Sequence, residues 1–419
     1  MPRFTIPRDI HYGRESVGLL STIRGKRAML VTVGGEMKQR GILSRAETAL
    51  RRTGMEVRLL EANNLEHVEQ AVAEGASAMR AFAPDWIVAL GSMAIDAAKL
   101  MWILYEYPEA ALSDLHLPFS LPDLRRKARF AAIPSIGGGA PEATAFAEVG
   151  GTAEQYAWAA VDYGIVPDVT FIDPELGAAA SSVEVAEAGL EAFAYALDAY
   201  AACEDAPFAE PPAQKAAELV LQHLVAAQAG DGFAREQILY AQTLAGIAFS
   251  NVRAGLTHAL VRQTAAVLAG GRAQRGALNV VFLPHVIRFN AEDSRIRARY
   301  ARLARALGLR GRADTLAVQA LTDEIEALCA TLKLACTLRQ FGNAQELEGR
   351  FPAIAARAAE DFCTQANPRA VSKEDALEIY QDAIDKNKKE GRLVIENNFL
   401  KATKEGLYVL NDILVDFMK

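Results

Sequence analysis

Short β-rich runs alternate with helical segments in the first part of the chain, and this alternation restricts the fold more than any other feature. The apolar runs lie at residues 28–33, 57–60, 86–90, 130–134 and 170–172. Helical segments at residues 45–52 and 65–82 separate the first three runs. Strands that are joined through helices pair in parallel, so the pattern predicts a βαβ arrangement with a Rossmann-like parallel sheet.

The second part of the chain shows a different pattern, which begins near Ser182. Alanine becomes frequent, β-branched runs disappear, and apolar residues recur three and four positions apart, as at Leu321, Ile325 and Leu328. We therefore predict an all-helical C-terminal domain after an α/β N-terminal domain. The expected boundaries are residues 1–181 for the α/β domain, residues 182–385 for the helical domain and residues 386–419 for a C-terminal extension.

The composition excludes several classes of protein. The chain has 419 residues, 51% of them hydrophobic, with 45 basic and 52 acidic side chains and a formal charge of −7. This excludes a disordered chain and argues against a nucleic-acid partner. The most apolar stretch, residues 86–104, is interrupted by Asp96 and Lys99, so we predict no membrane-spanning segment. The N-terminus lacks the apolar core of a secretory signal. The four cysteines lack CxxC spacing, which fits reduced thiols, so we expect a cytoplasmic protein with no membrane partner.

Three of the predicted strands run directly into glycine-containing segments. These segments are residues 32–35 (TVGG), 89–96 (ALGSMAID) and 133–141 (IPSIGGGAP). In an open parallel sheet, ligands bind beyond the carboxyl ends of the strands, where backbone N–H groups at a helix start can hold a phosphate. One such junction could be only a tight turn, but three in one sheet favour a nucleotide crevice. The candidate cofactor-binding residues are Gly34, Gly91, Ser92, Asp96, Ser135, Gly138 and Gly139.

Six segments in a fixed order make the sequence similar to a known family. They are residues 89–99 (ALGSMAIDAAK), 133–146 (IPSIGGGAPEATAF), 167–176 (PDVTFIDPEL), 189–200 (GLEAFAYALDAY), 245–260 (AGIAFSNVRAGLTHAL) and 279–290 (NVVFLPHVIRFN). Together they resemble the iron-containing, or group III, alcohol dehydrogenase family over roughly residues 3 to 385. The resemblance implies an NAD(P)-binding domain, a helical catalytic domain, hydride transfer between a small alcohol or aldehyde and a nicotinamide, and a homodimer.

The resemblance also implies a divalent metal held by one Asp and three His, and this sequence departs from that set. The first two ligands are spaced i, i+4 on a helix, where this chain has Glu191 and Tyr195. The third position matches His258, and the fourth aligns with Arg275. A neutral phenol, with a pKa of about 10, substitutes poorly for imidazole, and a fixed guanidinium repels a divalent cation. We therefore expect no metal, although Glu191 and His258 are residue types that can ligate.

The altered positions suggest other roles. His258 can act as a general acid or base because the pKa of imidazole lies near neutrality, although a structural role as a buried polar residue is the alternative. The Tyr195 hydroxyl can polarise a carbonyl by donating a hydrogen bond. Arg262, which stands where the family often has another active-site His, or Arg275 can hold an anionic part of the substrate.

The cofactor segments depart from the family pattern as well. The family's phosphate loop has three glycines before its Asp, whereas Gly91, Ser92 and Met93 provide a single glycine and one residue fewer. NAD or NADP is therefore expected as the cofactor through a weakened motif. Two function classes remain. One is an oxidoreductase that acts on a small alcohol or aldehyde without the usual metal, and the other is a catalytically silent paralogue that serves as a ligand-binding or scaffold subunit.

Overall fold

The structure, a computed structural model, describes residues 3–33, 37, 41–62, 68–149, 157–202, 206–253, 255–268, 274–342, 344–384, 393–396 and 399–402. The described residues group into two compact units. The first unit comprises Met1–Ala196 and Pro207–Arg253, and the second comprises Leu197–Ala206 and Ala254–Lys419. The cofactor candidate Gly34 and most of the predicted C-terminal extension lie outside the described residues.

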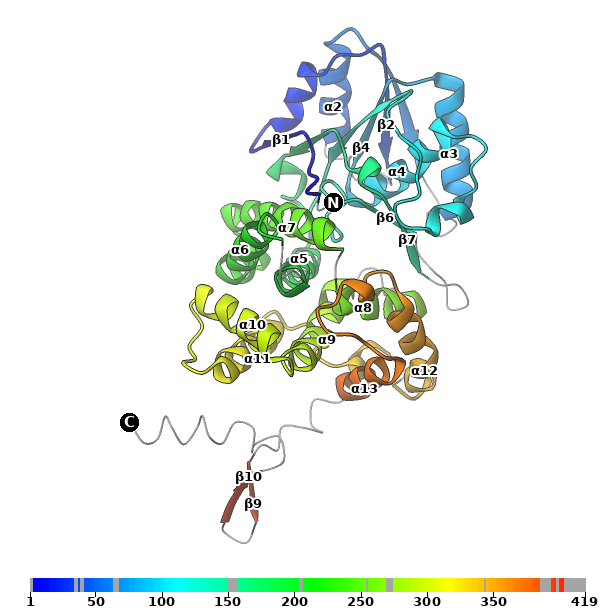
Figure 1. Ribbon diagram of the computed structural model, residues 1–419. Helices are drawn as coiled ribbons and strands as arrows, with labels where there is room; N and C mark the ends of the chain where they lie inside the picture. The colour runs from blue at the N-terminus through cyan, green and yellow to red at the C-terminus, as the bar shows by residue number, and fades with distance from the viewer. Residues whose placement is uncertain are drawn as a thin grey trace. The chain divides into compact units, whose positions relative to one another are not determined.

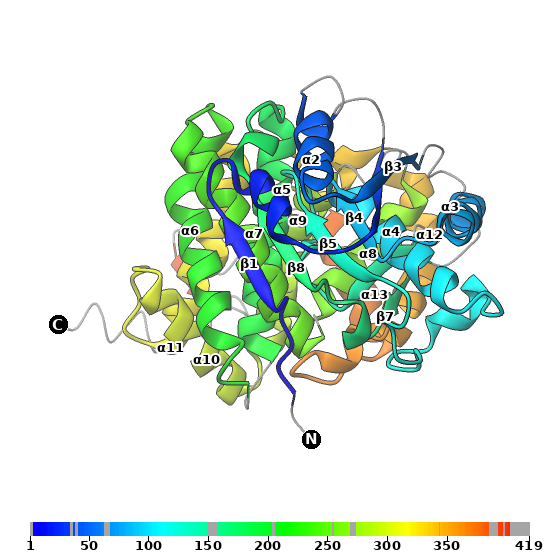
Figure 2. The ribbon, with the colours of Figure 1, turned by 90° about the horizontal axis from the view of Figure 1, so that it is seen from above.

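Within the described part of the first unit, six parallel strands form a single sheet (Figures 1 and 2). The strands are β1 (Asp9–Tyr12), β2 (Arg27–Thr32), β3 (Glu56–Glu61), β4 (Trp86–Leu90), β5 (Arg129–Ile133) and β8 (Val169–Ile172). Their order in the sheet is β1-β8-β5-β4-β2-β3, and each neighbouring pair is parallel. The predicted Rossmann-like α/β fold is confirmed, and β1, which the sequence analysis did not predict, is added at the edge beside β8.

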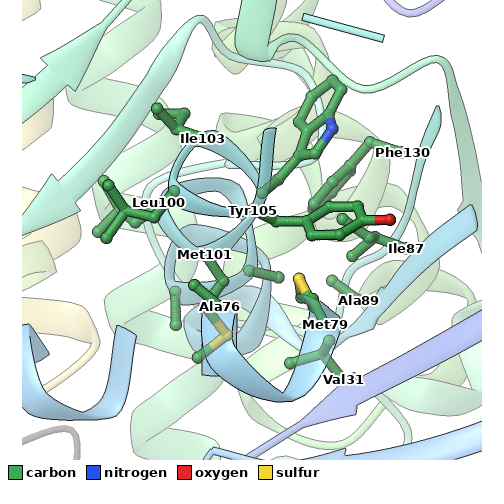
Figure 3. Packing of buried hydrophobic residues seen from close by; sticks show 14 of the residues in the cluster. Val31, Ala76, Met79, Ile87, Ala89, Leu100, Met101, Ile103, Tyr105 and Phe130 are labelled. Carbon is green, nitrogen blue, oxygen red and sulfur yellow. The ribbon is translucent and has the colours of Figure 1, made fainter. Parts of the chain in front are cut away.

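Helices cover both faces of the sheet because its central strands are apolar on both sides. The covering helices are η1 (Ser16–Thr22), α2 (Ile42–Arg51), α3 (Val68–Phe82) and α4 (Ser92–Glu106). Along β2, Met29 and Val31 pack with α3 and α4, whereas Ala28 and Leu30 pack with η1 and α2. Side chains alternate between the two faces of a strand, so one continuous apolar run serves both cores. Figure 1 shows α2 and α3 on opposite sides of the sheet, and Figure 3 shows the core formed with α3 and α4.

Further elements complete the first unit. They are strands β6 (Phe146–Val149) and β7 (Trp158–Val161), the 3-10 helices η3 (Leu112–His116), η4 (Tyr163–Ile165) and η5 (Pro174–Leu176), and helices α5 (Ser182–Ala202), α6 (Glu210–Gln228) and α7 (Gly232–Val252). Helix α5 begins at Ser182, but most of it clusters with the sheet, as do α6 and α7. Arg235 links α7 to the segment before α5, because its side chain donates hydrogen bonds to the carbonyl oxygens of Ala178 and Ala180. The domain boundary between residues 181 and 182 stays a prediction.

The second unit is built from helices, as predicted for the C-terminal region. They are α8 (Leu256–Val267), α9 (Arg275–Asn290), α10 (Ser294–Ala306), α11 (Asp314–Thr331), α12 (Ala344–Glu360) and α13 (Lys373–Ile384), with η7 (Leu338–Phe341) and η8 (Thr364–Ala366). Strands β9 (Leu393–Glu396) and β10 (Phe399–Ala402) form an antiparallel hairpin within the predicted extension. Over the residues that the structure describes, no helix is long and apolar enough to cross a membrane.

Candidate functional site

The strand order of the sheet reverses between β2 and β4. The chain runs from β2 outward to β3 and then returns to the other side of β2 with β4. Ligands of doubly wound sheets bind at such a switch point, beyond the carboxyl ends of the strands. Gly91 follows β4 with a φ of 96°, a value that favours glycine, and its carbonyl oxygen accepts the N–H of Ile95 at 3.0 Å as α4 begins. The first N–H groups of α4 therefore lie at this edge, where they fit a phosphate group of a nucleotide.

The loop after β5 lies beside the start of α4. Ser92 Oγ donates a hydrogen bond to the carbonyl oxygen of Ser135 at 3.3 Å, and a Cβ added at Gly137 would lie 3.4 Å from Ser92 Oγ. Gln242 of α7, which the sequence analysis did not identify, donates from Nε2 to the carbonyl oxygen of Gly137. Of the predicted cofactor-binding residues, this region holds Gly91, Ser92, Ser135, Gly138 and Gly139, and Asp96 lies one turn further along α4.

A buried lysine anchors the segment that follows this loop. Lys99 of α4 is fully buried, and its Nζ donates hydrogen bonds to the carbonyl oxygens of Thr144 at 2.7 Å and Phe146 at 2.8 Å. Burial lowers the pKa of Lys99 to about 8, while the carboxylates of Asp96 and Glu142 act in the opposite direction. The anchoring role of Lys99 was not predicted, although a lysine within a helix as apolar as α4 indicates a specific polar partner.

Glu142 connects the same segment to α7 and to β8. The Thr243 hydroxyl donates a hydrogen bond to Glu142 Oε1 at 2.7 Å, and the Thr170 hydroxyl donates to the carbonyl oxygen of Glu142 at 2.7 Å. Burial raises the pKa of the Glu142 carboxyl, against the hydrogen bond from Thr243 and the charge of Lys99. The chain after β5 is therefore held from three sides, by α4, α7 and β8.

Glu191 and Tyr195 form a hydrogen-bonded pair one turn apart in α5. Tyr195 Oη donates to Glu191 Oε1 at 3.0 Å, and the two residues are only 2% (Tyr195) and 3% (Glu191) exposed. The Tyr195 ring stacks on Phe249, with 4.2 Å between the ring centroids. A Cβ added at Gly138 would lie 1.5 Å from Glu191 Oε2. The carboxylate of Glu191 therefore contacts the predicted cofactor loop, at a point where only glycine leaves room for it.

In the second unit, a buried carboxylate fixes the start of α8. Asp198 accepts hydrogen bonds from the Thr257 hydroxyl at 2.9 Å and from the backbone N–H groups of Thr257 and His258. Burial raises the pKa of Asp198 to about 7, although these hydrogen bonds act in the opposite direction. A Cβ added at Gly255 would lie 2.9 Å from Asp198 Oδ2, so the residue before α8 must be small. These contacts hold the backbone of His258 in the first turn of α8, where the residue is buried.

Arg262 lies one turn after His258 and contacts residues that follow α12. Its Nη2 donates a hydrogen bond to Cys363 Sγ at 2.9 Å, and its Nη1 lies 3.7 Å from Asp361 Oδ2. The side chains of Arg262 and Asp361 are each 6% exposed, so this ion pair is largely shielded from water. Arg275 is the first residue of α9. The predicted roles of His258, Tyr195 and Arg262 in catalysis stay predictions.

The side chains at the four implied metal-ligand positions do not fit a divalent cation. In the first unit, Tyr195 uses its hydroxyl proton in the hydrogen bond to Glu191. In the second unit, His258 carries an imidazole, but Arg275 carries a permanent positive charge. Among the described residues, no three His, Cys, Asp or Glu side chains group around a possible metal position. The expectation that the chain binds no metal follows from this donor chemistry and stays a prediction.

Comparison with protein families gives two matches that together cover most of the chain. The model of the iron-containing alcohol dehydrogenase family matches residues 7–174. The model of the C-terminal part of the Fe-containing alcohol dehydrogenase family matches residues 185–384. The first match ends at the start of η5 and the second begins within the first turn of α5, so only residues 175–184 separate them.

Individual relatives agree with these matches. The NADPH-dependent butanol dehydrogenase of Clostridium saccharobutylicum is 39% identical over 91% of this chain and 97% of its own length. The aldehyde-alcohol dehydrogenase 2 of Entamoeba histolytica is 29% identical over 91% of this chain but only 46% of its own length, so the chain spans about half of that protein. The iron-containing alcohol dehydrogenase structure from Thermococcus thioreducens superposes with a TM-score of 0.82 at 29% identity, over 91% of this chain and 99% of that chain.

Proposed function

The chain belongs to the iron-containing alcohol dehydrogenase family, and on that premise we propose that it is an NAD(P)-dependent oxidoreductase that interconverts small alcohols and aldehydes without a bound divalent metal. The observation that carries the proposal is the 39% identity to an NADPH-dependent butanol dehydrogenase along 97% of that protein. NADPH and aliphatic aldehydes of the size of butanal are therefore the first candidates. Relatives with enzyme names match most of this chain, which does not support the alternative of a silent scaffold.

The proposed nucleotide position is the edge where Gly91 leads into α4. The backbone N–H groups of the first turn and the hydroxyl of Ser92 would hold a phosphate there. Met93, in the same turn, is 63% exposed, so it can be changed without disturbing a core. A Met93→Glu variant should raise the Kd for NADPH about five- to tenfold, because a carboxylate there opposes the phosphates by about 1 kcal/mol. A Met93→Gln variant is the matched control, and equal affinity of both variants would contradict this position.

Reduction of an aldehyde needs a hydride at the carbonyl carbon and a proton at the oxygen. NADPH, when bound, supplies the hydride. Without a metal, a hydrogen-bond donor must polarise the carbonyl, and we assign this role to the Tyr195 hydroxyl, which would exchange its hydrogen bond to Glu191 Oε1 for one to the substrate. We assign the proton transfer to the imidazole of His258, because imidazole is the side chain that most often serves as a general acid or base.

The test follows the oxidation of NADPH by butanal in wild type and in a His258→Ala variant. We expect the wild type to turn over and the variant to lose about 10²- to 10⁴-fold in kcat, the usual contribution of a positioned acid or base. Calorimetric titration with NADPH and NADH on the same samples separates lost chemistry from lost binding. Unchanged activity in His258→Ala would overturn the assigned role, and a wild type that binds neither nucleotide would favour the scaffold alternative.

We also propose that the protein forms a homodimer through the edge of its sheet. Strand β1 is one of the two edge strands of the six-stranded sheet, and Tyr12 at its end is 72% exposed. Phe208 is 70% exposed and packs against Phe4, with 5.8 Å between the ring centroids. Exposed apolar side chains beside an open strand edge favour pairing with a second chain. Light scattering should give a dimer mass for wild type and a monomer mass for Tyr12→Lys, and a wild-type monomer would contradict the proposal.

A further inference from the structure

Two cysteines meet at the C-terminal end of α11, in the second unit. Cys329 lies buried in the last turn of the helix, and Cys336 lies half-buried just before η7. Their Sγ atoms are 2.7 Å apart, with one thiol donating to the other. A disulfide bond is about 2.05 Å long, so the two sulfur atoms lie roughly 0.7 Å beyond bonding distance. Six residues separate the two cysteines in the sequence, a spacing that by itself indicates no pairing.

The turn between the two cysteines is fixed by backbone hydrogen bonds. Lys333 adopts a φ of 57°, in the left-handed region, and its N–H donates to the carbonyl oxygen of Ala330 at 3.1 Å. The N–H of Leu334 donates to the carbonyl oxygen of Cys329 at 3.3 Å. This is the hydrogen-bonding pattern of a Schellman motif, which reverses the chain direction at the end of a helix. The reversal brings the chain back toward Cys329 within a few residues.

The side chain of Gln340, in the 3-10 helix η7 that follows, fixes the backbone at Cys336. The backbone N–H of Cys336 donates to Gln340 Oε1 at 2.7 Å, and the backbone N–H of Thr337 donates to the same oxygen at 3.0 Å. Both cysteines therefore sit on backbone whose path is set by hydrogen bonds, on opposite sides of one tight turn. Little chain entropy remains to be lost when their sulfur atoms join.

We propose that Cys329 and Cys336 are an oxidisable thiol pair that forms a reversible intramolecular disulfide with a low-molecular-weight disulfide, such as glutathione disulfide, as the oxidant. This inference is independent of the proposed dehydrogenase function. Exposure sets the order of the steps, because Cys336 is partly accessible whereas Cys329 is 2% exposed. Cys363, which is fully buried beside Arg262, is not a candidate for this exchange.

The exchange takes place in two steps. The thiolate of Cys336 attacks one sulfur of the oxidant, an S–S bond forms, and one glutathione leaves as its thiolate. The thiolate of Cys329 then attacks Sγ of Cys336 and displaces the second glutathione. The protein loses two electrons and two protons, and the oxidant takes up both as it becomes two molecules of free thiol. A dithiol reductant reverses both steps.

The sequence around the pair allows a direct test on the full-length wild-type protein. Trypsin cleaves after Lys333, so the two cysteines leave on separate peptides, residues 313–333 and 334–339. After treatment with glutathione disulfide and alkylation of the remaining thiols, we expect a non-reduced digest to contain these two peptides joined by a disulfide. Reduction with dithiothreitol before alkylation should return both as separate, alkylated peptides. The peptide that contains Cys363 should be alkylated in both samples.

Single variants provide the matched controls. Cys329→Ser should retain glutathione on Cys336, because the resolving thiol is missing, whereas Cys336→Ser should leave Cys329 largely unreacted. The proposal is overturned if the two wild-type peptides stay separate and alkylated after oxidation. It is also overturned if wild type accumulates a stable glutathione adduct on Cys336, or if the oxidised protein is joined between two chains.

Discussion

Removal of the Tyr195 hydroxyl tests the hydrogen-bonded pair that stands where the family's first two metal ligands are implied. A Tyr195→Phe variant keeps the aromatic ring and therefore its stacking on Phe249. It removes the donor 3.0 Å from Glu191 Oε1, at a position where both residues are almost fully buried. A hydrogen bond to a charged acceptor contributes roughly 1.5–3 kcal/mol, and removing it leaves the carboxylate with one donor fewer. We expect the variant to lose this amount of unfolding free energy.

The assay is urea unfolding, with Tyr105→Phe as the matched control from the same unit. The Tyr105 hydroxyl donates to the carbonyl oxygen of Pro84 at 3.1 Å, so its acceptor is neutral and its removal should cost only about 1 kcal/mol. Glu191→Gln keeps a carbonyl acceptor, and the double variant should show a coupling of about 1 kcal/mol with Tyr195→Phe. A loss no greater in Tyr195→Phe than in Tyr105→Phe, or the absence of coupling, would refute the reasoning.

Three further changes probe the loop after β5. Lys99→Met removes both hydrogen bonds of the buried ammonium and its charge beside Glu142. Urea unfolding should therefore show a loss of roughly 3–5 kcal/mol in unfolding free energy. A loss below about 1 kcal/mol would show that the lysine is not an anchor. Gly138→Ala should destabilise the protein by about 1–3 kcal/mol, because the added Cβ overlaps the Glu191 carboxylate. In a double variant, Glu191→Ala should relieve most of that loss. If the stability losses of the two single variants simply add in the double variant, the contact between the two residues is contradicted. Thr243→Val removes a hydrogen bond to the ionised Glu142 carboxylate, so the pKa of Glu142 in the folded protein should rise further above its unfolded value. The variant's loss of unfolding free energy should therefore grow as pH rises, because the lost hydrogen bond matters most when the carboxyl is ionised. A loss that stays constant across pH would refute this expectation.

The sheet and the helical region followed from patterns that burial imposes on the sequence. Strands β2 and β4 are buried on both faces, so they are continuously apolar and their positions can be read directly. Strand β1, with the sequence DIHY, is half-exposed at the sheet edge and has no such pattern. Strands β6 and β7 form a short, separate antiparallel pair. They are strands because they pair with each other, and their composition alone does not indicate it.

The candidate site was predictable only in part. The glycine at position 91 could be predicted, because a strand must turn there to enter a helix. The need for glycine at position 138 could not, because the atom that excludes a Cβ belongs to Glu191, more than fifty residues later in the chain. The same holds for Arg262, whose partners Cys363 and Asp361 are about a hundred residues away. Contacts at such sequence separations leave no local pattern.

The central claim, an active dehydrogenase without a divalent metal, is tested most directly by measuring metal content and activity on one preparation. The protein is dialysed against a chelator, analysed for iron and zinc, and assayed for NADPH-dependent reduction of butanal before and after addition of Fe²⁺ or Zn²⁺. We predict metal far below one ion per chain, activity that survives the chelator, and no gain on adding either ion. Activity that disappears with the chelator and returns with one equivalent of metal would contradict the account, as would the absence of activity in every sample.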